Sequence, residues 1–375
     1  MTEPMTNPYL KVEGLSVRFP THDGVVQAVS DLSYEVELGK TLGIVGESGS
    51  GKSVSSLAVM GLHDMSHTNM TGSIKLEEQE VIGLAEDKMR RLRGNASAMI
   101  FQDPLTALHP FYTIGAQIIE AYRAHHPKTS KKKGRQKAIE MLERVGIPQP
   151  NRRVDDFPHQ FSGGMRQRAM IAMSLVNDPK LLIADEPTTA LDVTVQAQIL
   201  DLLQELQRDF GSAIIIITHD LGVVAEMADD VLVMYGGRCV EYGACKEVLT
   251  HPEMPYTWGL LNSIPDLRGN TEERLRPIPG TPPSLLSPPS GCAFNPRCGY
   301  THLVEGGLCT RELPVLEAGD RGSSHLKRCH LTHPESVLRT ERPAEHEGEL
   351  EEPDQIGEGS DVPVTTDDSA KVEKA

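Results

Sequence analysis

One stretch decides the fold of this 375-residue chain: Gly46-Glu47-Ser48-Gly49-Ser50-Gly51-Lys52-Ser53. It follows the apolar run 41–45, and a helix is expected after it, so we predict the order strand, glycine-rich loop, helix. The spacing G-x-x-x-x-G-K-[ST] lets backbone N–H groups close around a phosphate, with the Lys52 ammonium on the outer phosphates and the Ser53 hydroxyl on Mg²⁺. The positive end of the helix adds to this attraction. We therefore expect phosphate binding by Gly46, Ser48, Gly49, Ser50, Gly51, Lys52 and Ser53.

A phosphate loop alone leaves kinases, GTPases and ATPases open, and a second stretch narrows the choice. This stretch reads Leu181-Leu182-Ile183-Ala184-Asp185-Glu186. Its four apolar residues predict a buried strand that delivers Asp185 to the Mg²⁺ ion. Glu186 is then placed to polarise a water for attack on the γ-phosphate. The alternative is a solvated acidic turn after a strand, and the upstream phosphate loop argues against it.

A third motif, Ser162-Gly163-Gly164, lies shortly before that strand. A Ser-Gly-Gly run at the start of a helix offers a hydroxyl and unobstructed N–H groups to an anion. The alternative for this segment viewed alone is an ordinary helix N-cap without a ligand. The motif therefore becomes informative only together with the other two.

Composition and charge exclude several classes of protein. The formal net charge is −16, and residues 341–375 contribute −9 of it, from twelve acidic and three basic residues. An acidic chain is a poor partner for nucleic acid, which needs clustered Lys and Arg. The longest strongly apolar run, 213–217, is far shorter than the roughly 20 residues of a membrane span. No signal peptide is recognised at the start, so we expect a cytosolic location.

The order of predicted elements favours an α/β fold. Residues 1–9 form a polar leader, and residues 10–250 alternate strands and helices, with 103–165 mostly helical. The apolar runs 181–184 and 213–217 suit a parallel sheet covered on both faces. The composition changes after about residue 250, where 251–335 are expected to form a small second unit rich in Pro and Cys. Residues 336–375 are acidic and expected to be disordered.

Taken together, the motifs resemble the ABC ATPase family over about residues 10–250. Residues 46–53 match its Walker A loop, Asp185 and Glu186 end its Walker B strand, and Ser162-Gly163-Gly164 match its signature. The further matching positions are Gln102 in the Q-loop, Asp192 in the D-loop, the switch histidine His219, and Phe19 where the family stacks an aromatic ring on adenine. The resemblance implies a P-loop cassette with a RecA-like core, an antiparallel β subdomain and a helical subdomain.

The resemblance also implies cofactors, roles and partners. ATP and Mg²⁺ would be bound, with Ser53, Gln102 and Asp185 as the residues at the metal and with Glu186, His219 and Gln102 as the catalytic set. Two cassettes would sandwich two ATP molecules, each lying between one phosphate loop and the partner's signature. The second cassette is expected to be a different chain, although a homodimer stays open. Two transmembrane permease subunits and, indirectly, an extracytoplasmic solute-binding protein would complete a transporter, with this chain at the cytoplasmic face of the membrane.

The C-terminal part resembles the oligopeptide and dipeptide permease ATPases. The stretches that carry this resemblance are 251–257 and 278–283, and Met254 stands where the subfamily usually has His. The function implied is ATP hydrolysis that powers peptide import. A nickel or other small-solute importer of the same architecture is the alternative. A soluble ABC protein acting on nucleic acid or ribosomes is a third hypothesis, which the single cassette and acidic tail argue against.

Four cysteines gather in the C-terminal part: Cys292, Cys298, Cys309 and Cys329. Four thiolates can hold a [4Fe–4S] cluster or a tetrahedral Zn²⁺ ion. The absence of a C-x₂₋₄-C pair favours iron–sulfur, and the subfamily resemblance favours it further. Four unligated thiols are the remaining alternative.

Overall fold

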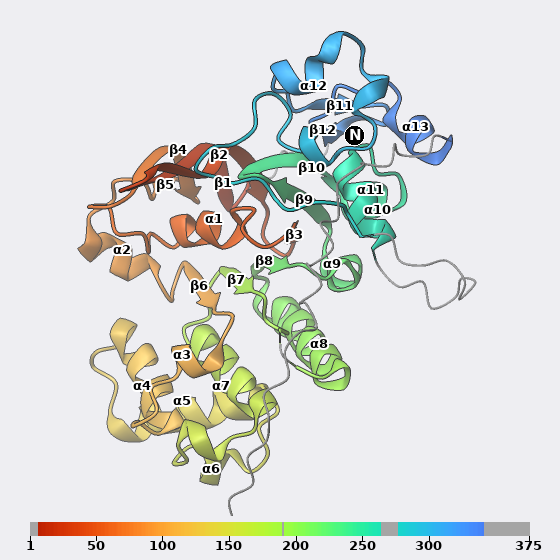
Figure 1. Ribbon diagram of the computed structural model, residues 1–375. Helices are drawn as coiled ribbons and strands as arrows, with labels where there is room; N and C mark the ends of the chain where they lie inside the picture. The colour runs from red at the N-terminus through yellow and green to blue at the C-terminus, as the bar shows by residue number, and fades with distance from the viewer. Residues whose placement is uncertain (1–6, 190, 264–276, 341–375) are drawn as a thin grey trace, which may run out of the picture.

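The computed structural model describes residues 7–189, 191–263 and 277–340 (Figure 1). Its largest sheet is mixed and has the strand order β11 (Glu317–Gly319), β12 (Gly322–Lys327), β10 (Arg238–Ala244), β9 (Asp230–Tyr235), β3 (Thr41–Val45), β8 (Ala213–Thr218), β7 (Leu181–Asp185) and β6 (Ser97–Ile100). The strands from β9 to β6 run parallel to one another, whereas β10 to β12 are antiparallel. The α/β prediction is thereby confirmed.

The central parallel strands form because their sequences are apolar throughout. Every residue of β3, β7 and β8 is buried, as expected for strands covered on both faces. Helices α1 (Lys52–Val59), α8 (Val193–Phe210) and α9 (Leu221–Met227) connect or flank them. In the register of the sheet, Val45 lies beside Thr218 and Asp185 beside Ile217. The segments that follow these strands, which begin at Gly46, Glu186 and His219, therefore start at one edge of the sheet.

A second, antiparallel sheet lies next to the phosphate-loop helix. Its order is β2 (Gly24–Val36), β1 (Leu10–Thr21), β4 (Asn69–Leu76) and β5 (Gln79–Glu80), and α2 (Glu86–Leu92) follows. The alternating apolar residues of β1 and β2 pack with β3, α1 and β8 in one core. This sheet confirms the predicted antiparallel β subdomain.

The segment between β6 and β7 is helical, as predicted. It contains α3 (Pro104–Ala107), α4 (Ile114–His125), α5 (Lys131–Arg144), α6 (Pro150–Arg153), the 3₁₀ turn η1 (Pro158–Gln160) and α7 (Gly163–Leu175). Apolar residues of α4, α5 and α7 share a core with β6, β7 and α8. Helix α5 starts at Lys131, because the Ser130 side chain caps it by accepting from the N–H of Lys133.

The C-terminal part corrects one expectation. We predicted a small separate unit, but β12 pairs with β10 and so continues the main sheet. The remaining elements are α10 (Cys245–Thr250), α11 (Pro255–Asn262), η2 (Asn295–Arg297), η3 (Thr301–Leu303), η4 (Glu305–Gly307), α12 (Leu308–Arg311) and α13 (Pro334–Thr340). Buried residues of this part share a core with Val45 of β3 and Tyr235 of β9. The C-terminal part is therefore an extension of the cassette. Its apolar residues follow no clear sequence period, but they pack against the main sheet.

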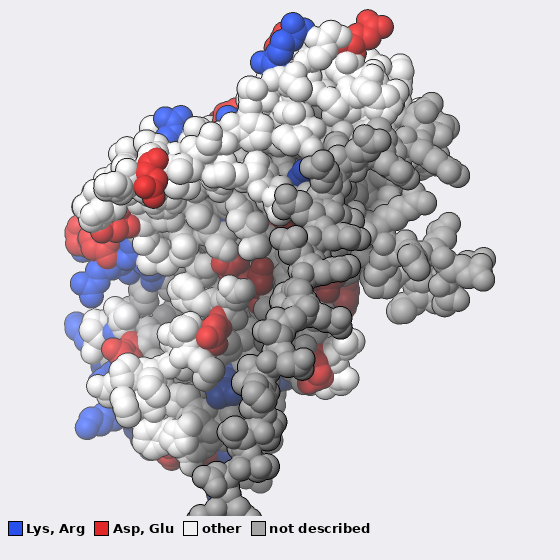
Figure 2. Space-filling model, in the orientation of Figure 1, with Lys and Arg blue, Asp and Glu red and all other residues white. Residues whose placement is uncertain are grey.

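The length of the helices and the placement of surface charge bear on contacts with membranes and nucleic acids. Among the described helices, none is both long and apolar enough to cross a membrane. On the face shown in Figure 2, the described Lys and Arg side chains are interspersed with Asp and Glu along the edge of the molecule. This face offers a polyanion no continuous basic stripe formed by the described residues.

Candidate functional site

The phosphate loop is shaped by two glycines that no other residue could replace without strain. Gly46 has φ 149° and Gly51 has φ 101°. A Cβ atom at Gly46 would collide with the carbonyl oxygen of Met234, and one at Gly51 with that of Ala28. The loop therefore closes against β9 and β2, which fixes where its N–H groups point.

Lys52 lies inside this loop. Its Nζ donates to the carbonyl oxygens of Gly46 at 2.7 Å and Glu47 at 2.9 Å, and the residue is only 6% exposed. Burial lowers the pKa of its ammonium group, which the negative charges of Glu186 and Asp185 partly offset. A cation held here among carbonyl oxygens can turn toward an incoming phosphate.

Asp185 and Ser53 face each other across the loop, as the sequence predicted for a magnesium site. The Ser53 hydroxyl donates to Asp185 Oδ1 at 3.1 Å. Burial, together with the charge of Glu186, raises the pKa of the Asp185 carboxyl group. A carboxylate and a hydroxyl at a phosphate loop are hard oxygen donors, which suit Mg²⁺ completed by phosphate oxygens and water. The residues therefore fit the ion that the family implies.

Glu186 is held by contacts from three segments. Its Oε2 accepts hydrogen bonds from Gln102 Nε2 at 2.8 Å and from Thr189 Oγ1 at 2.9 Å. Its Oε1 lies 3.4 Å from His219 Nδ1, although the imidazole is 63% exposed. Its backbone has φ 47°, and its N–H donates to Ile217 O at 2.8 Å. The structure thus brings together Gln102, Glu186 and His219, which the sequence named as the catalytic set.

The signature lies elsewhere in the molecule. Ser162 caps α7, and its hydroxyl accepts from Met165 N at 3.3 Å. In Figure 1, α7 lies in the helical part of the molecule, well separated from α1, which follows the phosphate loop. The helix that begins with Ser162, Gly163 and Gly164 is therefore separate from the helix that follows the phosphate loop of the same chain.

Two further predicted residues, Asp192 and Phe19, have contacts of other kinds. Asp192 caps α8 by accepting from Val195 N at 2.9 Å. Phe19 lies near the end of β1, where its ring meets that of His63 edge-on at 5.6 Å. Their expected contacts with ATP or with a partner cassette are untested by the structure.

Sequence reasoning missed three contributors to the site. Thr189 holds Glu186 directly, and its position three residues after a carboxylate at a strand end was the available signal. Tyr256 and Arg297 reach the loop from the C-terminal extension, where they contact Glu47. No local pattern predicts contacts over more than 200 residues, so these two could not have been found.

The four C-terminal cysteines are free thiols that gather in one buried apolar cluster: Cys292, Cys309 and Cys329 belong to it, and Cys298 packs against it. Burial raises the pKa of all four thiols, that of Cys292 to about 12, which favours the neutral form. Within the described ranges, however, no group of three or more His, Cys, Asp and Glu is arranged to hold a metal ion. The structure therefore does not support the expected metal centre on these thiols.

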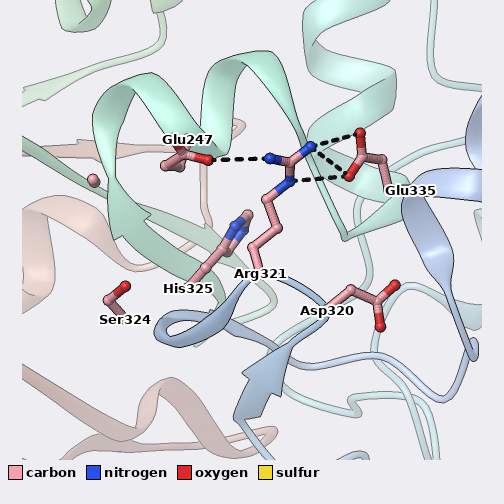
Figure 3. A pocket seen from close by; sticks show the side chains of 7 residues that line it. Glu247, Asp320, Arg321, Ser324, His325 and Glu335 are labelled. Carbon is pink, nitrogen blue, oxygen red and sulfur yellow. Dashed lines mark hydrogen bonds and ion pairs between the residues drawn. The ribbon is translucent and has the colours of Figure 1, made fainter.

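A pocket in the C-terminal extension lies outside the phosphate-loop region (Figure 3). Arg321, which follows β11, reaches Glu335 of α13 at 3.0 Å and Glu247 of α10 at 3.7 Å. His325 lines the same pocket and hydrogen-bonds the buried Glu241 at 2.8 Å. These ion pairs tie the last described helix to the extension.

The chain resembles solved ABC cassettes in fold. A dimeric ATP-binding cassette bound to ADP and Pi matches with a TM-score of 0.57 at 24% identity, covering 63% of this chain and 98% of that one. A Clostridium perfringens cassette, part of the ABC transporter complex cbiONQ, matches with a TM-score of 0.55 at 31% identity, covering 65% and 91%.

Sequence comparisons cover more of the chain. The ABC transporter family matches residues 29–189, and the oligopeptide/dipeptide transporter C-terminal region matches residues 240–303. The oligopeptide transport ATP-binding protein OppD of Bacillus subtilis is 49% identical over 87% of this chain and 90% of its own length. The dipeptide transport ATP-binding protein DppD of the same organism is 50% identical over 86% and 94%. Together with the site geometry, these similarities show that the chain belongs to the ABC transporter ATP-binding proteins of the oligopeptide and dipeptide transporter type.

Proposed function

We propose that this chain hydrolyses ATP to power a membrane importer of oligopeptides or dipeptides. The observation that carries the proposal is the convergence of Lys52, Asp185 and Glu186 at one edge of the sheet, in a chain whose C-terminal extension matches peptide transporters. A nickel or other small-solute importer is the second candidate, because it would use the same ATP site.

Each residue at the site has a role that its contacts suggest. Lys52 leaves the carbonyl oxygens of the loop and pairs with the β- and γ-phosphates. Ser53, Asp185 and Gln102 would hold Mg²⁺, which neutralises charge on the phosphates when it is bound. Glu186 accepts the proton of the attacking water, and Gln102, Thr189 and His219 keep its carboxylate in place.

The site is proposed to be completed by a second cassette. Ser162, Gly163 and Gly164 lie at the exposed start of α7, away from the loop of the same chain, and would bind the ATP held by the partner. Asp192 would lie at the same interface, and Phe19 would stack on adenine. We favour a different chain as the partner, because related importers often pair two different cassettes.

The permease contact is proposed on the helical part. Large apolar side chains are exposed around the Q-loop and before α4: Phe101 at 40%, Leu105 at 61%, Phe111 at 82% and Tyr112 at 57%. Exposed apolar side chains that gather in one segment mark interaction sites. Because Gln102 lies among them, a permease bound here could move the residue that orients Glu186. In the proposed complex the chain would lie at the cytoplasmic face of the membrane, beside two permease subunits and indirectly linked to a solute-binding protein.

The domain limits are proposed as 10–250 for the cassette and 251–335 for the extension.

A [4Fe–4S] cluster on the four cysteines is likewise a proposal, which rests on their number and on their place in one apolar cluster, although the described side chains are not arranged as a metal site. Iron and sulfide analysis of anaerobically purified protein tests this directly, and one equivalent of zinc without iron would decide for Zn²⁺.

The proposed transport function is tested with the assembled complex in proteoliposomes. The chain is co-expressed with its permease subunits and partner cassette, and uptake of labelled peptide is measured with ATP present. Peptide uptake that stops when ATP is withheld supports the proposal. ATP-dependent nickel uptake without peptide uptake would select the second candidate, and failure to co-purify with any permease would contradict both.

A further inference from the structure

Arg297 joins the C-terminal extension to the phosphate loop by a two-pronged ion pair. Its Nη1 donates to Glu47 Oε2 at 2.6 Å and its Nη2 to Glu47 Oε1 at 3.0 Å. Glu47 is the second residue of the loop, whereas Arg297 ends the turn η2, 250 residues later in the chain. The Arg297 side chain is only 5% exposed. Ion pairs with this planar, bidentate geometry are the strong and specific ones.

The remaining donors of Arg297 are also used. Its Nε donates to Pro279 O at 2.7 Å, and further N–H groups reach Tyr235 Oη at 3.2 Å and Ile278 O at 3.3 Å. The guanidinium also lies 5.8 Å from the ring of Tyr235. All five N–H donors of an arginine are thus accounted for, so the side chain has one well-defined position.

Glu47 itself is held at three points. Its carboxylate is bound by Arg297, its N–H donates to Tyr256 Oη at 2.8 Å, and its carbonyl oxygen accepts from Lys52 Nζ at 2.9 Å. Tyr256 belongs to α11 of the extension and is fully buried. The extension therefore holds the residue on which the phosphate-binding Lys52 rests.

We propose that Arg297 is a positioning residue for nucleotide binding, which acts through Glu47 to keep the phosphate loop in its binding shape. A loop that already has its binding shape loses less conformational freedom when ATP binds, so its affinity for ATP is higher. Without Arg297, the Glu47 carboxylate would lose its partner next to the path of a triphosphate and would repel it. The inference rests on the assignment of residues 46–53 to ATP binding.

Steady-state ATPase measurements on the assembled transporter test this inference. Arg297→Met is expected to raise the KM for ATP roughly tenfold and to change kcat less than threefold, because the reacting groups around Glu186 are untouched. Glu47→Gln, which removes the charge from the loop side, should raise KM as well. In the double variant, the KM for ATP should rise by less than the product of the two single increases, because no carboxylate is left unpaired.

Arg321→Met is the matched control, since Arg321 forms ion pairs in the same extension without contacting the loop (Figure 3). It should leave KM unchanged. The inference would be overturned by a normal KM for ATP in both single variants, or by a KM in the double variant that rises by the full product of the two single increases. Lys52→Ala tests the ATP site independently of Arg297. If Lys52→Ala also leaves the KM for ATP unchanged, the assignment of the phosphate loop is wrong as well as the inference about Arg297.

Discussion

Gln102 donates a hydrogen bond of 2.8 Å to the carboxylate of Glu186, although the two residues are 84 positions apart. The contact forms because β6 and β7 are parallel neighbours, with Ile100 beside Ala184, so that the residues following the two strands meet. Gln102 also lies among the exposed apolar side chains proposed to bind a permease. A movement of that partner would therefore change how the proposed base is oriented.

Lys52→Ala is expected to weaken ATP binding by about 2 kcal/mol, or roughly 30-fold, because it removes a charged donor to the phosphates. Equilibrium titration of the isolated chain with ATP measures this loss. Lys40→Ala is the control, since Lys40 lies just before β3 but pairs with Asp229 at 3.0 Å. Equal affinities of the Lys52 variant and the wild type would show that the loop is not the phosphate site.

Ser162→Asp is expected to reduce ATP turnover of the assembled transporter at least tenfold while leaving ATP binding by the isolated chain intact. Asp still caps a helix, so α7 should form, but its charge would repel the phosphates held by the partner cassette. Ser130→Asp is the matched control, because Ser130 caps α5 with the same hydrogen-bond length of 3.3 Å. Weakened binding in the isolated Ser162 variant would contradict a site shared between two chains.

His325→Ala should destabilise the C-terminal extension by about 3 kcal/mol, because it removes the imidazole that pairs with a buried carboxyl group. His325 is 2% exposed and hydrogen-bonds Glu241, which is completely buried. His333→Ala is the control, since its side chain is 81% exposed and pairs with Asp320 at the surface, and it should change stability by less than about 0.5 kcal/mol. Urea unfolding of both variants measures the difference, and equal midpoints would count against a structural role for the buried pair.

The sequence predicted the parts whose signals are local. The phosphate loop and the strand ending in Asp185 follow from motif spacing and an apolar run, and the structure has them where expected. The continuation of the main sheet by β12 could not be predicted, because its pairing of Glu241 with Lys327 depends on tertiary packing. The Arg297–Glu47 ion pair could not be predicted for the same reason, because the two residues are 250 positions apart. Residues 336–340 of the tail that was expected to be disordered belong to helix α13, and its residues from 341 onward lie outside the described ones.

ATP turnover of the assembled transporter carrying Glu186→Gln tests the central claim most directly. The amide keeps the shape of the side chain but cannot accept the proton of the attacking water, so turnover should fall by about 10²- to 10⁴-fold. ATP affinity should stay within a few-fold of wild type, because Glu186 does not hold the phosphates. Glu205→Gln, an exposed position on α8, is the matched control and should turn over normally. Near wild-type turnover by the Glu186 variant would contradict the account.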